Sequence, residues 1–491
     1  MKYLSELLNK KIKGTYKDIP VMSLCYDSRK ISKNSIFFAI KGFKQDGNDY
    51  INDAVAKGAT AIVSEKEIPV SLQNVYWEQV ADVREAMAMI SSKFYEDNLK
   101  KISLIGITGT NGKTTTSYLI DSLLSAAGYR TGVVGTLGFR STAYSSVSTL
   151  TTPESIDLHQ FLNSLAENGT EYAAMEVSSH AIALKRVHGL HFRIAIFTNL
   201  TRDHLDFHET IQNYFNTKKK LFQKDTGCHA DIALINGDDI FGREIIQERK
   251  TADMEVLSYG LASDNDFRCL QYEVSREGIQ MKVDLMGDIF QVESPLMGFP
   301  NVYNLLSACS AASLLGVKKE YLCEASSTFK GVKGRFERID YGQQHLIIID
   351  YAHTEDAIAY LVKMIRQFTR GRVIIVFGCG GGRDQGKRKL MGKAAAHGAD
   401  YIIITSDNPR NENPLDIIAM IEEGVKEVQP QPFYEIIADR EKAIFRAVKI
   451  AQPDDSIVLA GKGHEDYQII GPQKLHFDER EILKRAIEGS K

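Results

Sequence analysis

Residues 102–116 read ISLIGITGTNGKTTT and lead into SYLI at 117–120. An apolar run is followed by a glycine-rich turn, a lysine and a threonine, and then by residues that favour a helix. A strand, a turn and a helix in this order direct backbone N–H groups toward phosphate oxygens. Lys113 would neutralise the β- and γ-phosphates, and the hydroxyl of Thr114 would hold Mg²⁺. The stretch predicts a nucleotide phosphate site.

The glycine spacing departs from the usual phosphate-loop pattern. That pattern has a glycine six residues before the lysine, where this chain has Ile107, and Gly106 lies one residue too early. The pattern Gly109-x-x-Gly112-Lys113-Thr114 remains. A glycine turn that only packs a helix on a sheet is the alternative, but the expected strand–helix context favours phosphate binding.

Length and composition are those of a soluble globular protein of about three domains. The formal net charge of −3 gives no strong field for nucleic acid or an anionic membrane. The N-terminal residues are too polar for a signal peptide, and no apolar run reaches membrane-spanning length. The six cysteines contain no C-x-x-C pair, which indicates reduced thiols rather than a zinc site. We therefore expect a cytoplasmic protein with no nucleic-acid or membrane partner.

Apolar runs that end in polar, often glycine-rich, segments recur along the chain. They span 102–107, 172–177, 194–198, 232–235, 346–349, 373–377, 401–405 and 457–460. Continuous apolar runs suit strands of a parallel sheet that is covered on both faces. Ligands bind beyond the carboxyl ends of such strands, so we expect the polar segments to line a cleft.

The pattern predicts an α/β protein of three domains. A small α/β domain would span 1–98, a central domain with a mostly parallel sheet 99–332, and a C-terminal Rossmann-like domain 333–491. Apolar and polar residues alternate over 268–294, which predicts antiparallel strands appended to the central sheet.

Two residues of the central domain are candidate metal ligands. Glu176 and His204 each follow a separate expected strand, and a carboxylate with an imidazole near a nucleotide can hold a second divalent cation. His204 and His208 are four residues apart, but a zinc-protease motif would need Glu where Leu205 stands. The alternative for His204 is a polar strand end that hydrogen-bonds to backbone.

Basic residues of the third domain point to an anionic ligand. Arg383, Lys387 and Arg388 follow the glycines at 380–382, and Arg410 ends the sequence Asp-Asn-Pro-Arg. Arginine recognises carboxylate or phosphate through two parallel N–H groups. Arginines at two strand ends therefore suggest an anionic small molecule, whereas either motif alone would suggest surface arginines.

Taken together, the motifs resemble those of the Mur ligases over about 27–468. The resemblance rests on GTNGKT (109–114), EVSSH (176–180), NLTRDHLDFH (199–208), NVYN (301–304), GRFER (334–338), DYAH (350–353) and GKGHED (461–466). The phosphate loop alone is shared with folylpolyglutamate synthetases, and the last two motifs make the match more specific.

The resemblance implies an ATP-dependent amide ligase that works through an acyl phosphate. Lys113, Lys218, Glu176 and His204 match the family's catalytic residues. Two Mg²⁺ ions are implied, with Thr114, Glu176, His204 and Lys218 as ligands. Lys218 matches a family lysine that CO₂ converts to a carbamate, and the anion that results can bind metal.

The resemblance also implies a division of the remaining site residues. ATP would contact Gly109, Thr110, Asn111, Gly112, Lys113, Thr114, Thr115, Asn304, Arg335 and Asp350. A UDP-muramoyl substrate would contact Ser28, Phe43, Lys44, Thr151, Thr152, Ser178 and Arg186. An incoming amino acid would contact Arg383, Asp407, Asn408, Pro409, Arg410, Gly461 and Glu465. Leu184 stands where some family members have Gln, so one polar contact would be missing.

The segment Asp407–Arg410 resembles the signature of ligases that add meso-diaminopimelate. This amino acid has a distal carboxylate, which Arg410 would pair with, and a distal ammonium for Glu465. The implied reaction joins meso-diaminopimelate to the D-glutamate of UDP-N-acetylmuramoyl-L-Ala-D-Glu in peptidoglycan synthesis. We expect the enzyme to be a monomer. The alternatives are an L-lysine-adding or D-Ala-D-Ala-adding ligase, a folylpolyglutamate synthetase, or a nucleotide-binding switch without ligase chemistry.

Overall fold

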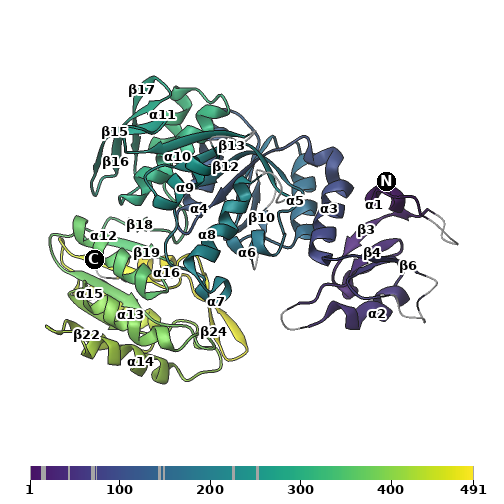
Figure 1. Ribbon diagram of the computed structural model, residues 1–491. Coiled ribbons are helices and arrows are strands. Elements are labelled where there is room, and N and C mark those ends of the chain that lie inside the picture. Colours follow the sequence, from purple (N-terminus) through teal and green to yellow (C-terminus); the bar gives the residue numbers. More distant parts are fainter. Residues whose placement is uncertain are drawn as a thin grey trace. The chain divides into compact units, whose positions relative to one another are not determined.

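The computed structural model describes residues 2–12, 18–42, 45–67, 72, 75–141, 145–146, 150–223, 227–249 and 254–489 (Figure 1). The chain forms two compact units. The first comprises Met1–Gln271, Lys282–Val292 and Tyr303–Ser326, and the second comprises Tyr272–Met281, Glu293–Val302 and Ser327–Lys491.

The first unit begins with a small α/β layer. Its elements are β1 (Lys2–Tyr3), α1 (Leu4–Leu8), β2 (Pro20–Val21), β3 (Ser23–Cys25), η1 (Ser28–Lys30), β4 (Ser35–Phe38), η2 (Gly47–Tyr50), α2 (Ile51–Ala56), β5 (Ala59–Ser64), β6 (Tyr76–Gln79) and α3 (Val83–Leu99). Strands β3, β4, β5 and β6 pair in parallel in that order. Ile36 and Phe38 of β4 face one buried cluster and Phe37 the other, so the sheet is covered on both faces.

A larger sheet follows in the chain. Its elements are β7 (Ser103–Thr108), α4 (Lys113–Ala126), β8 (Thr131–Gly135), β9 (Gly138–Ser141), β10 (Ser145–Ser146), α5 (Ser155–Glu167), β11 (Tyr172–Glu176), α6 (Ser179–Ala183), β12 (His191–Phe197), α7 (Leu205–His208), α8 (Ile211–Lys219), η4 (Lys220–Phe222), β13 (His229–Asn236), α9 (Ile240–Arg249), β14 (Glu255–Gly260), β15 (Phe267–Val274), β16 (Ile279–Leu285), β17 (Asp288–Ser294), α10 (Pro300–Leu314) and α11 (Lys319–Thr328). The strand order is β10-β9-β8-β11-β7-β12-β13-β14-β15-β16-β17.

The centre of this sheet is parallel, as the apolar runs predicted. Strands β8, β11, β7, β12, β13 and β14 pair in parallel, and β8, β9 and β10 pair antiparallel at one end. Strands β15, β16 and β17 continue the sheet at its other end, and β15 pairs with β14 in parallel. The antiparallel pairing that the alternation over 268–294 predicts stays a prediction. The sequence analysis did not predict strands β9 and β10.

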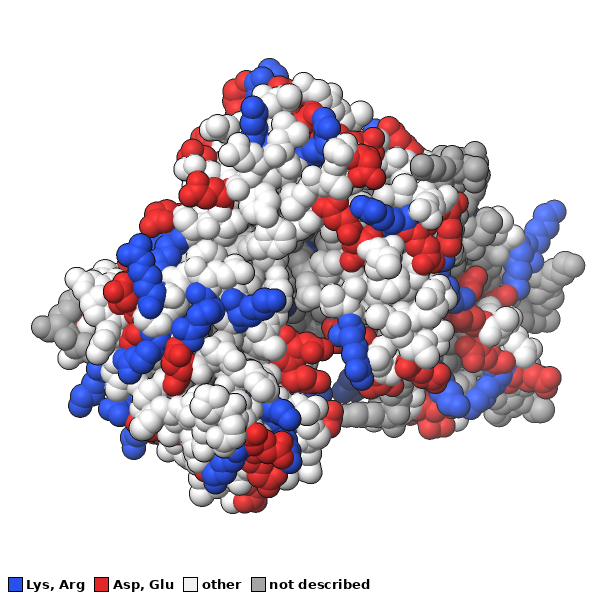
Figure 2. Space-filling view, turned by 60° about the vertical axis from the view of Figure 1, so that its left-hand side comes forward, with Lys and Arg blue, Asp and Glu red and all other residues white. Residues whose placement is uncertain are grey.

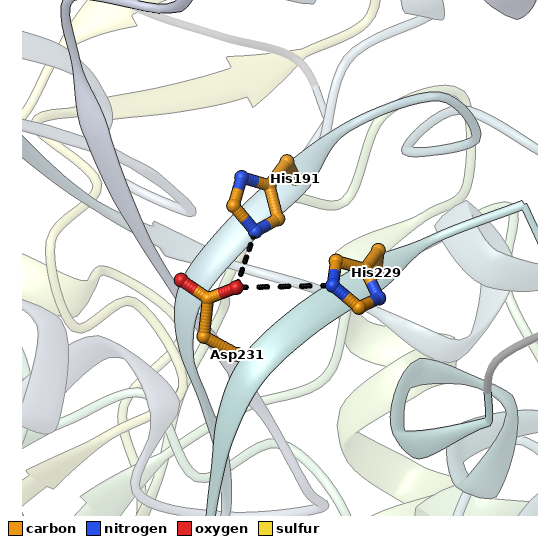
Figure 3. Close-up of side chains that lie close together, drawn as sticks. All are labelled: His191, His229 and Asp231. Carbon is orange, nitrogen blue, oxygen red and sulfur yellow. Dashed lines mark hydrogen bonds and ion pairs between the residues drawn. The ribbon is translucent and has the colours of Figure 1, made fainter. Parts of the chain in front are cut away.

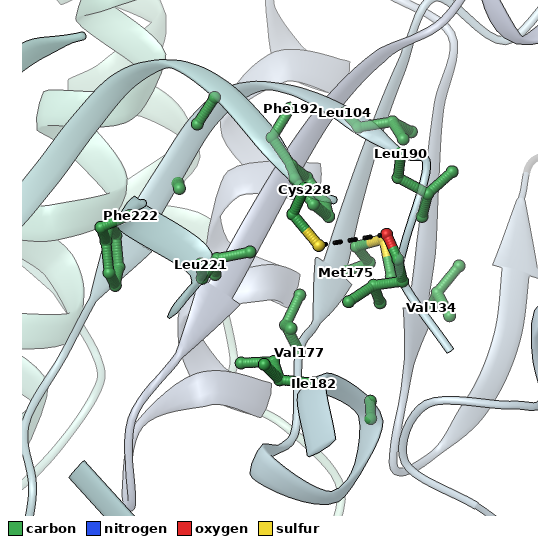
Figure 4. Close-up of a cluster of buried hydrophobic side chains, with 14 of the residues drawn as sticks. Leu104, Val134, Met175, Val177, Ile182, Leu190, Phe192, Leu221, Phe222 and Cys228 are labelled. Atoms are coloured by element: carbon green, nitrogen blue, oxygen red, sulfur yellow. Dashed lines mark hydrogen bonds between the residues drawn. The ribbon is translucent and has the colours of Figure 1, made fainter. Parts of the chain in front are cut away.

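One face of the large sheet is sealed by an apolar cluster (Figure 4). Phe192 of β12, Met175 of β11 and Leu221 of η4 are all buried in it. The thiol of Cys228 donates a hydrogen bond to the carbonyl of Val187 at 3.3 Å. Close packing of these apolar residues fixes the strand ends, and the strand ends in turn position the polar loops that follow them.

The second unit contains a six-stranded sheet with the order β18-β19-β23-β20-β21-β22. Its elements are β18 (Glu337–Ile339), β19 (Leu346–Asp350), α12 (Glu355–Phe368), β20 (Val373–Phe377), α13 (Gly386–Ala396), β21 (Tyr401–Ile404), α14 (Pro414–Lys426), β22 (Phe433–Ile436), α15 (Arg440–Ile450), β23 (Ser456–Ala460), β24 (Tyr467–Ile470), β25 (Gln473–His476) and α16 (Glu479–Glu488). All pairings in this sheet are parallel except β18 with β19.

Alternate residues of these strands enter two different cores. Ile375 and Phe377 of β20 pack with α12, α13 and α14, whereas Ile374 and Val376 pack with α15 and α16. This is the doubly covered parallel sheet expected for a Rossmann-like domain. The polar loops after β19, β20, β21 and β23 therefore leave the sheet on the same side.

Thus the α/β class and the mostly parallel sheets are confirmed. The boundaries at 98 and 332 stay predictions. Within the described residues, no helix combines the length and apolar character needed to cross a membrane. Acidic and basic side chains are interspersed on the face shown in Figure 2.

Candidate functional site

The phosphate loop lies where the sequence predicted it. Strand β7 ends at Thr108 and helix α4 begins at Lys113, with the glycine turn between them. The Lys113 ammonium donates to the carbonyls of Gly109 (3.0 Å) and Thr110 (2.9 Å). The lysine therefore lies over the turn, and the first N–H groups of the 14-residue helix α4 open on the same turn.

Two positions in the turn require glycine. Gly109 has φ +146° and Gly112 has φ +87°, a region that residues with a Cβ rarely adopt. A Cβ on Gly109 would lie 1.9 Å from Oγ1 of Thr198, and one on Gly112 would lie 2.5 Å from Oδ1 of Asn304. The positive φ values and the close neighbours together explain why Gly109 and Gly112 cannot carry a side chain without a shift of the structure.

Asn304 lies beside the phosphate loop. It belongs to α10, far along the chain, and its Oδ1 accepts a 3.4 Å hydrogen bond from the Thr116 hydroxyl of α4. Thr114 is buried, whereas Asn111 is exposed and Thr110 and Thr115 are half-buried. The structure therefore places the predicted ATP residues of the first unit along one strand–turn–helix and the helix beside it.

Lys218 also reaches the phosphate loop. It is 1% exposed, and its ammonium donates to the carbonyl of Gly109 at 2.8 Å. Burial lowers the pKa of Lys218 well below its usual value, and the positive charge of Lys113 lowers it further. Lys219 instead forms ion pairs with Glu244 (3.3 Å) and Glu248 (2.9 Å). The two neighbours thus have different environments, one at the loop and one in a surface ion pair.

Glu176 is a buried carboxylate that forms no ion pair with the residues that the structure describes. It is 1% exposed, and its oxygens accept from the backbone N–H of Thr136 (2.8 Å) and from the Thr136 hydroxyl (3.1 Å). Both donors are neutral. A buried carboxylate that accepts from neutral donors suits a cation, because a bound cation would balance its charge.

A second group of predicted residues surrounds the end of β11. The Thr152 hydroxyl donates to the carbonyl of Glu176 at 2.7 Å, and Thr151 lies 3.2 Å from Thr136, hydroxyl to hydroxyl. The backbone N–H of Ser178 donates to the Thr152 hydroxyl at 3.2 Å. The structure therefore joins Thr151, Thr152, Glu176 and Ser178 in one hydrogen-bonded cluster.

Arg186 joins this cluster through a residue that the sequence did not single out. Arg186 donates to the carbonyl of Thr152 at 3.0 Å and pairs with Glu154 at 2.9 Å. Glu154 also pairs with Arg84 of α3 at 3.0 Å. Glu154 thus fixes the orientation of Arg186 and joins the small N-terminal layer to the large sheet. No sequence motif marks this carboxylate.

His204 lies in a group of rings after β12. It has φ +53° and an exposed side chain, and its ring lies 4.9 Å from that of His180. Its neighbour His208 is buried and lies 2.9 Å from the Ser179 hydroxyl through Nε2. Glu176 and His204 are not hydrogen-bonded to each other. Both rings lie against those of His180 and Tyr214, and they differ in that His204 is exposed whereas His208 is buried.

Of the N-terminal residues expected at a UDP group, Ser28 alone is described. It is buried and begins the short helix η1, and its carbonyl accepts from the Lys57 ammonium at 3.1 Å. Asp27 accepts from the backbone N–H of Arg29 and forms an ion pair with its guanidinium at 2.7 Å. Phe43 and Lys44 lie outside the described residues.

In the second unit, Asn408 and Glu465 come together from two different strand ends. The Asn408 side-chain amide donates to Oε2 of Glu465 at 2.8 Å, and the Lys462 ammonium lies 3.3 Å from Oδ1 of Asn408 and 3.5 Å from the same Glu465 oxygen. Lys462 is fully buried. The lysine therefore orients the carboxylate through Oε2, and Oε1 is not used in these contacts.

Arg410 is held by the loop that follows β20. Its Nη1 donates to the carbonyl of Gly381 at 2.7 Å, and its backbone has φ +54°. Backbone bonds to Ile469 (3.1 Å) and Gly471 (2.7 Å) fix its main chain. Arg383, by contrast, is exposed. One edge of the Arg410 guanidinium is thus anchored to the loop after β20.

A buried arginine, Arg388, lies beneath the glycine loop at 380–382. Arg388 is fully buried and pairs with Glu412 at 2.9 Å, so it supports the glycine loop and is not exposed to a ligand. Glu412 also accepts from the backbone N–H of Gly382. The sequence grouped Arg388 with Arg383 but did not reveal the carboxylate opposite it.

Asp407 is fixed by neighbouring strand ends. It is buried, its carbonyl accepts from the Gln468 amide at 2.6 Å, and its Oδ2 lies 4.0 Å from the Arg440 guanidinium. A Cβ on Gly461 (φ +109°) would lie 3.0 Å from that oxygen. The predicted residues Asp407, Asn408, Pro409, Arg410, Gly461 and Glu465 therefore form one continuous cluster in this unit.

Arg335 and Asp350 form a separate group. Asp350 accepts from the backbone N–H groups of Phe336 (2.7 Å) and Ala352 (2.8 Å), and the Arg335 guanidinium stacks over the Tyr351 ring at 5.2 Å. Burial raises the pKa of Asp350 above its usual value, against the lowering effect of the Phe336 N–H. The carboxylate fastens β19 to the segment before β18.

Comparisons with known proteins match most of the chain. Family models match at 20–95 (Mur ligase family, catalytic domain), 107–312 (Mur ligase middle domain) and 334–463 (Mur ligase, glutamate ligase domain). Two curated relatives carry the name UDP-N-acetylmuramoyl-L-alanyl-D-glutamate–2,6-diaminopimelate ligase. The protein of Solibacter usitatus is 43% identical, with 96% of this chain and 94% of the relative covered. That of Alkaliphilus oremlandii is 41% identical, with 98% of both covered.

A solved structure of a protein with the same name is similar over nearly the whole length. It has a TM-score of 0.74 and 33% identity, and the match covers 99% of each chain. Structures of MurF from Acinetobacter baumannii, at 20% identity and a TM-score of 0.62, share the fold.

Proposed function

Because the chain belongs to the Mur ligase family, we propose that it is the ATP-dependent ligase that joins meso-diaminopimelate to UDP-N-acetylmuramoyl-L-Ala-D-Glu. The product would serve peptidoglycan synthesis in the cytoplasm. Two features support the proposal: the phosphate loop of the first unit, which suits ATP, and the polar cluster of the second unit, which suits an amino acid. The curated relatives with this activity in their names match nearly the entire chain.

One observation carries the choice of amino acid. Arg410 presents a guanidinium anchored at one edge, and Glu465 presents a carboxylate oriented by Asn408 and Lys462, in the same loop cluster. An arginine and a glutamate suit the carboxylate and the ammonium of a distal amino-acid head. L-Lysine lacks that distal carboxylate, so it would leave Arg410 without its partner.

The reaction would proceed in two steps. The γ-phosphoryl group of ATP passes to a carboxylate oxygen of the D-glutamate, which gives an acyl phosphate and ADP. The neutral amine then attacks the acyl carbon, and the tetrahedral intermediate expels phosphate to leave the amide. Lys113 stabilises the charge on the transferred group, and the main contributions are positioning and electrostatics.

Mg²⁺ fits the residues present. Glu176 is a buried carboxylate that accepts from the neutral donors of Thr136, and Thr114 and His204 supply a hydroxyl and an imidazole. We propose these residues with Lys218 as the ligands of two ions. Bound Mg²⁺ would neutralise phosphate charge.

Carbamylation of Lys218 is part of the proposal. Reaction with CO₂ needs a neutral amine, and burial lowers the pKa of Lys218 well below its usual value. The carbamate would exchange a buried cation beside Lys113 for an anion. Lys219 lacks this environment because it pairs with Glu244 and Glu248.

The muramoyl substrate is assigned to the first unit. Thr151, Thr152, Ser178 and Arg186 form one cluster around the end of β11, and Arg186 is held there by Glu154. Ser28, with Phe43 and Lys44, is proposed for the uridine diphosphate. We propose ATP contacts at residues 109–115, Asn304, Arg335 and Asp350.

The decisive experiment measures phosphate release with ATP and every combination of the two other substrates. We expect release only when UDP-N-acetylmuramoyl-L-Ala-D-Glu and meso-diaminopimelate are both present, with a product mass that corresponds to the amide. Efficient use of L-lysine in a parallel reaction would contradict the substrate choice. Phosphate release without any amino acid would contradict the ligase mechanism. Sedimentation of the active protein would test the expected monomer.

A further inference from the structure

We propose that His191, His229 and Asp231 form a surface binding site for a divalent transition-metal ion of the Zn²⁺ class. Their ligand atoms all lie within 4.8 Å of one another, and they are the group of this kind found among the described residues (Figure 3). Nε2 of His191 lies 2.7 Å from Oδ1 of Asp231, and Nε2 of His229 lies 3.7 Å from the same oxygen. The proposal is independent of the ligase function.

The sheet brings the three residues together. His191 begins β12 and His229 begins β13, and the two are direct partners in the parallel pairing of these strands. Asp231 lies two residues after His229, so it emerges on the same face. The intervening Phe192 and Ala230 point into the apolar cluster on the other face. The ligand backbones are therefore held by a packed sheet and need little ordering when a metal binds.

The three side chains face one another, and Asp231 also forms an ion pair with Arg193. The two imidazoles stack with centroids 5.1 Å apart and planes at 17°, and both are exposed. Arg193 donates to Oδ2 of Asp231 at 2.9 Å. This contact occupies one carboxylate oxygen and turns Oδ1 toward both histidines, the role that a second-layer partner has in many metal sites.

The donor set selects the metal. Two imidazole nitrogens and one carboxylate oxygen suit Zn²⁺, Ni²⁺ and Cu²⁺, whereas Mg²⁺ prefers oxygen ligands and retains its water. Ligands of one zinc ion lie no more than ~4.2 Å apart, at ~2.0–2.1 Å from the metal, so exposed rings need only small rotations to close the site. Water would complete the coordination.

The site is distinct from the proposed ligase site. His191 and His229 lie at the amino ends of their strands, while the phosphate loop and His204 follow carboxyl ends in the same sheet. The seven residues of β12 alone span roughly 20 Å. A metal at one end would therefore not touch the groups at the other.

The test is a titration of the full-length protein with Zn²⁺ against a chromophoric chelator, in excess Mg²⁺ so that the ligase site is occupied. We expect one Zn²⁺ per chain at this site. His191→Gln and His229→Gln should each weaken it by about tenfold or more, because each removes one ligand of three. His397→Gln, which changes an exposed histidine of the other unit, is the matched control and should leave it unchanged.

A second measurement protects the result from folding artefacts. Zn²⁺ should raise the thermal midpoint of the parent protein and of His397→Gln, but not that of the His191→Gln/His229→Gln double variant. Circular dichroism without metal should be the same for all. Failure of the parent protein to bind, or unchanged stoichiometry and affinity in the double variant, would overturn the proposal.

Discussion

Replacement of Arg410 by lysine should damage the use of diaminopimelate selectively. Lysine keeps the charge but cannot present two parallel N–H groups to one carboxylate. The backbone at this position has φ +54°, which costs lysine and arginine the same, so the change adds no strain. Loss of the Nη1 contact with Gly381 (2.7 Å) removes the anchor that orients the side chain.

The size of the effect follows from the interaction that is lost. A hydrogen-bonded pair between charged groups is worth about 2–3 kcal/mol, which corresponds to a rise in the diaminopimelate KM of roughly 30- to 150-fold. The KM values for ATP and for the UDP substrate should barely change, because other residues hold those ligands. Loss of the bond to Gly381 should cost the fold only about 1 kcal/mol.

The assay is steady-state phosphate release with each substrate varied in turn. Arg370→Lys, an exposed arginine of the same unit, is the matched control and should leave all three constants unchanged. An equal rise in all three KM values for Arg410→Lys would mean that the arginine is structural. An unchanged diaminopimelate KM would refute the assignment.

Three further changes test other parts of the molecule. Lys113→Ala should reduce ligation by about a hundredfold or more with unchanged circular dichroism, because it removes the charge over the phosphate loop; near-normal turnover would contradict the phosphate site. Lys218→Ala should be nearly inactive and partly rescued by short carboxylic acids, whereas Lys219→Ala should stay active. The reverse pattern would show that the carbamate belongs to Lys219. Buried His159 has its pKa lowered from 6.5 to about 4 by burial, so the unfolded chain binds the proton more readily. The contribution of neutral His159 to the free energy of unfolding should therefore be fully present above about pH 6.5 and fall by about 3 kcal/mol as the pH drops toward 4. Urea unfolding of His159→Phe should lack this loss. The same acid dependence in both proteins would refute the role given to His159.

Local features of the chain could be predicted from the sequence because their causes are local. The run before Gly109 is apolar enough for a buried strand, and the turn has glycine at the two positions with positive φ. The eight apolar runs likewise predicted parallel sheets with polar loops at their carboxyl ends. Strand–turn–helix periodicity depends on neighbours in the chain, so the residues themselves carry it.

The three lysines at 218–220 show what the local sequence cannot distinguish. Three successive lysines at 218–220 look alike in the sequence, but only the fold makes Lys218 buried at Gly109 and sends Lys219 to Glu244 and Glu248. Burial depends on which residues distant in the chain pack around a side chain. The environment that lowers the pKa of Lys218 is therefore a property of the tertiary structure.

The residues that orient the sites were decided only by the tertiary structure. Glu154 reaches both Arg84 and Arg186, Lys462 lies buried against Glu465, and Arg388 pairs with Glu412. Phosphate and carboxylate contacts leave motifs because chemistry demands particular residues at particular spacings. A supporting carboxylate or ammonium can come from any point in the chain, provided that the fold brings it to the right place. The sequence by itself therefore determined which loops are candidates for binding, and the folded sheets determined which residues orient them.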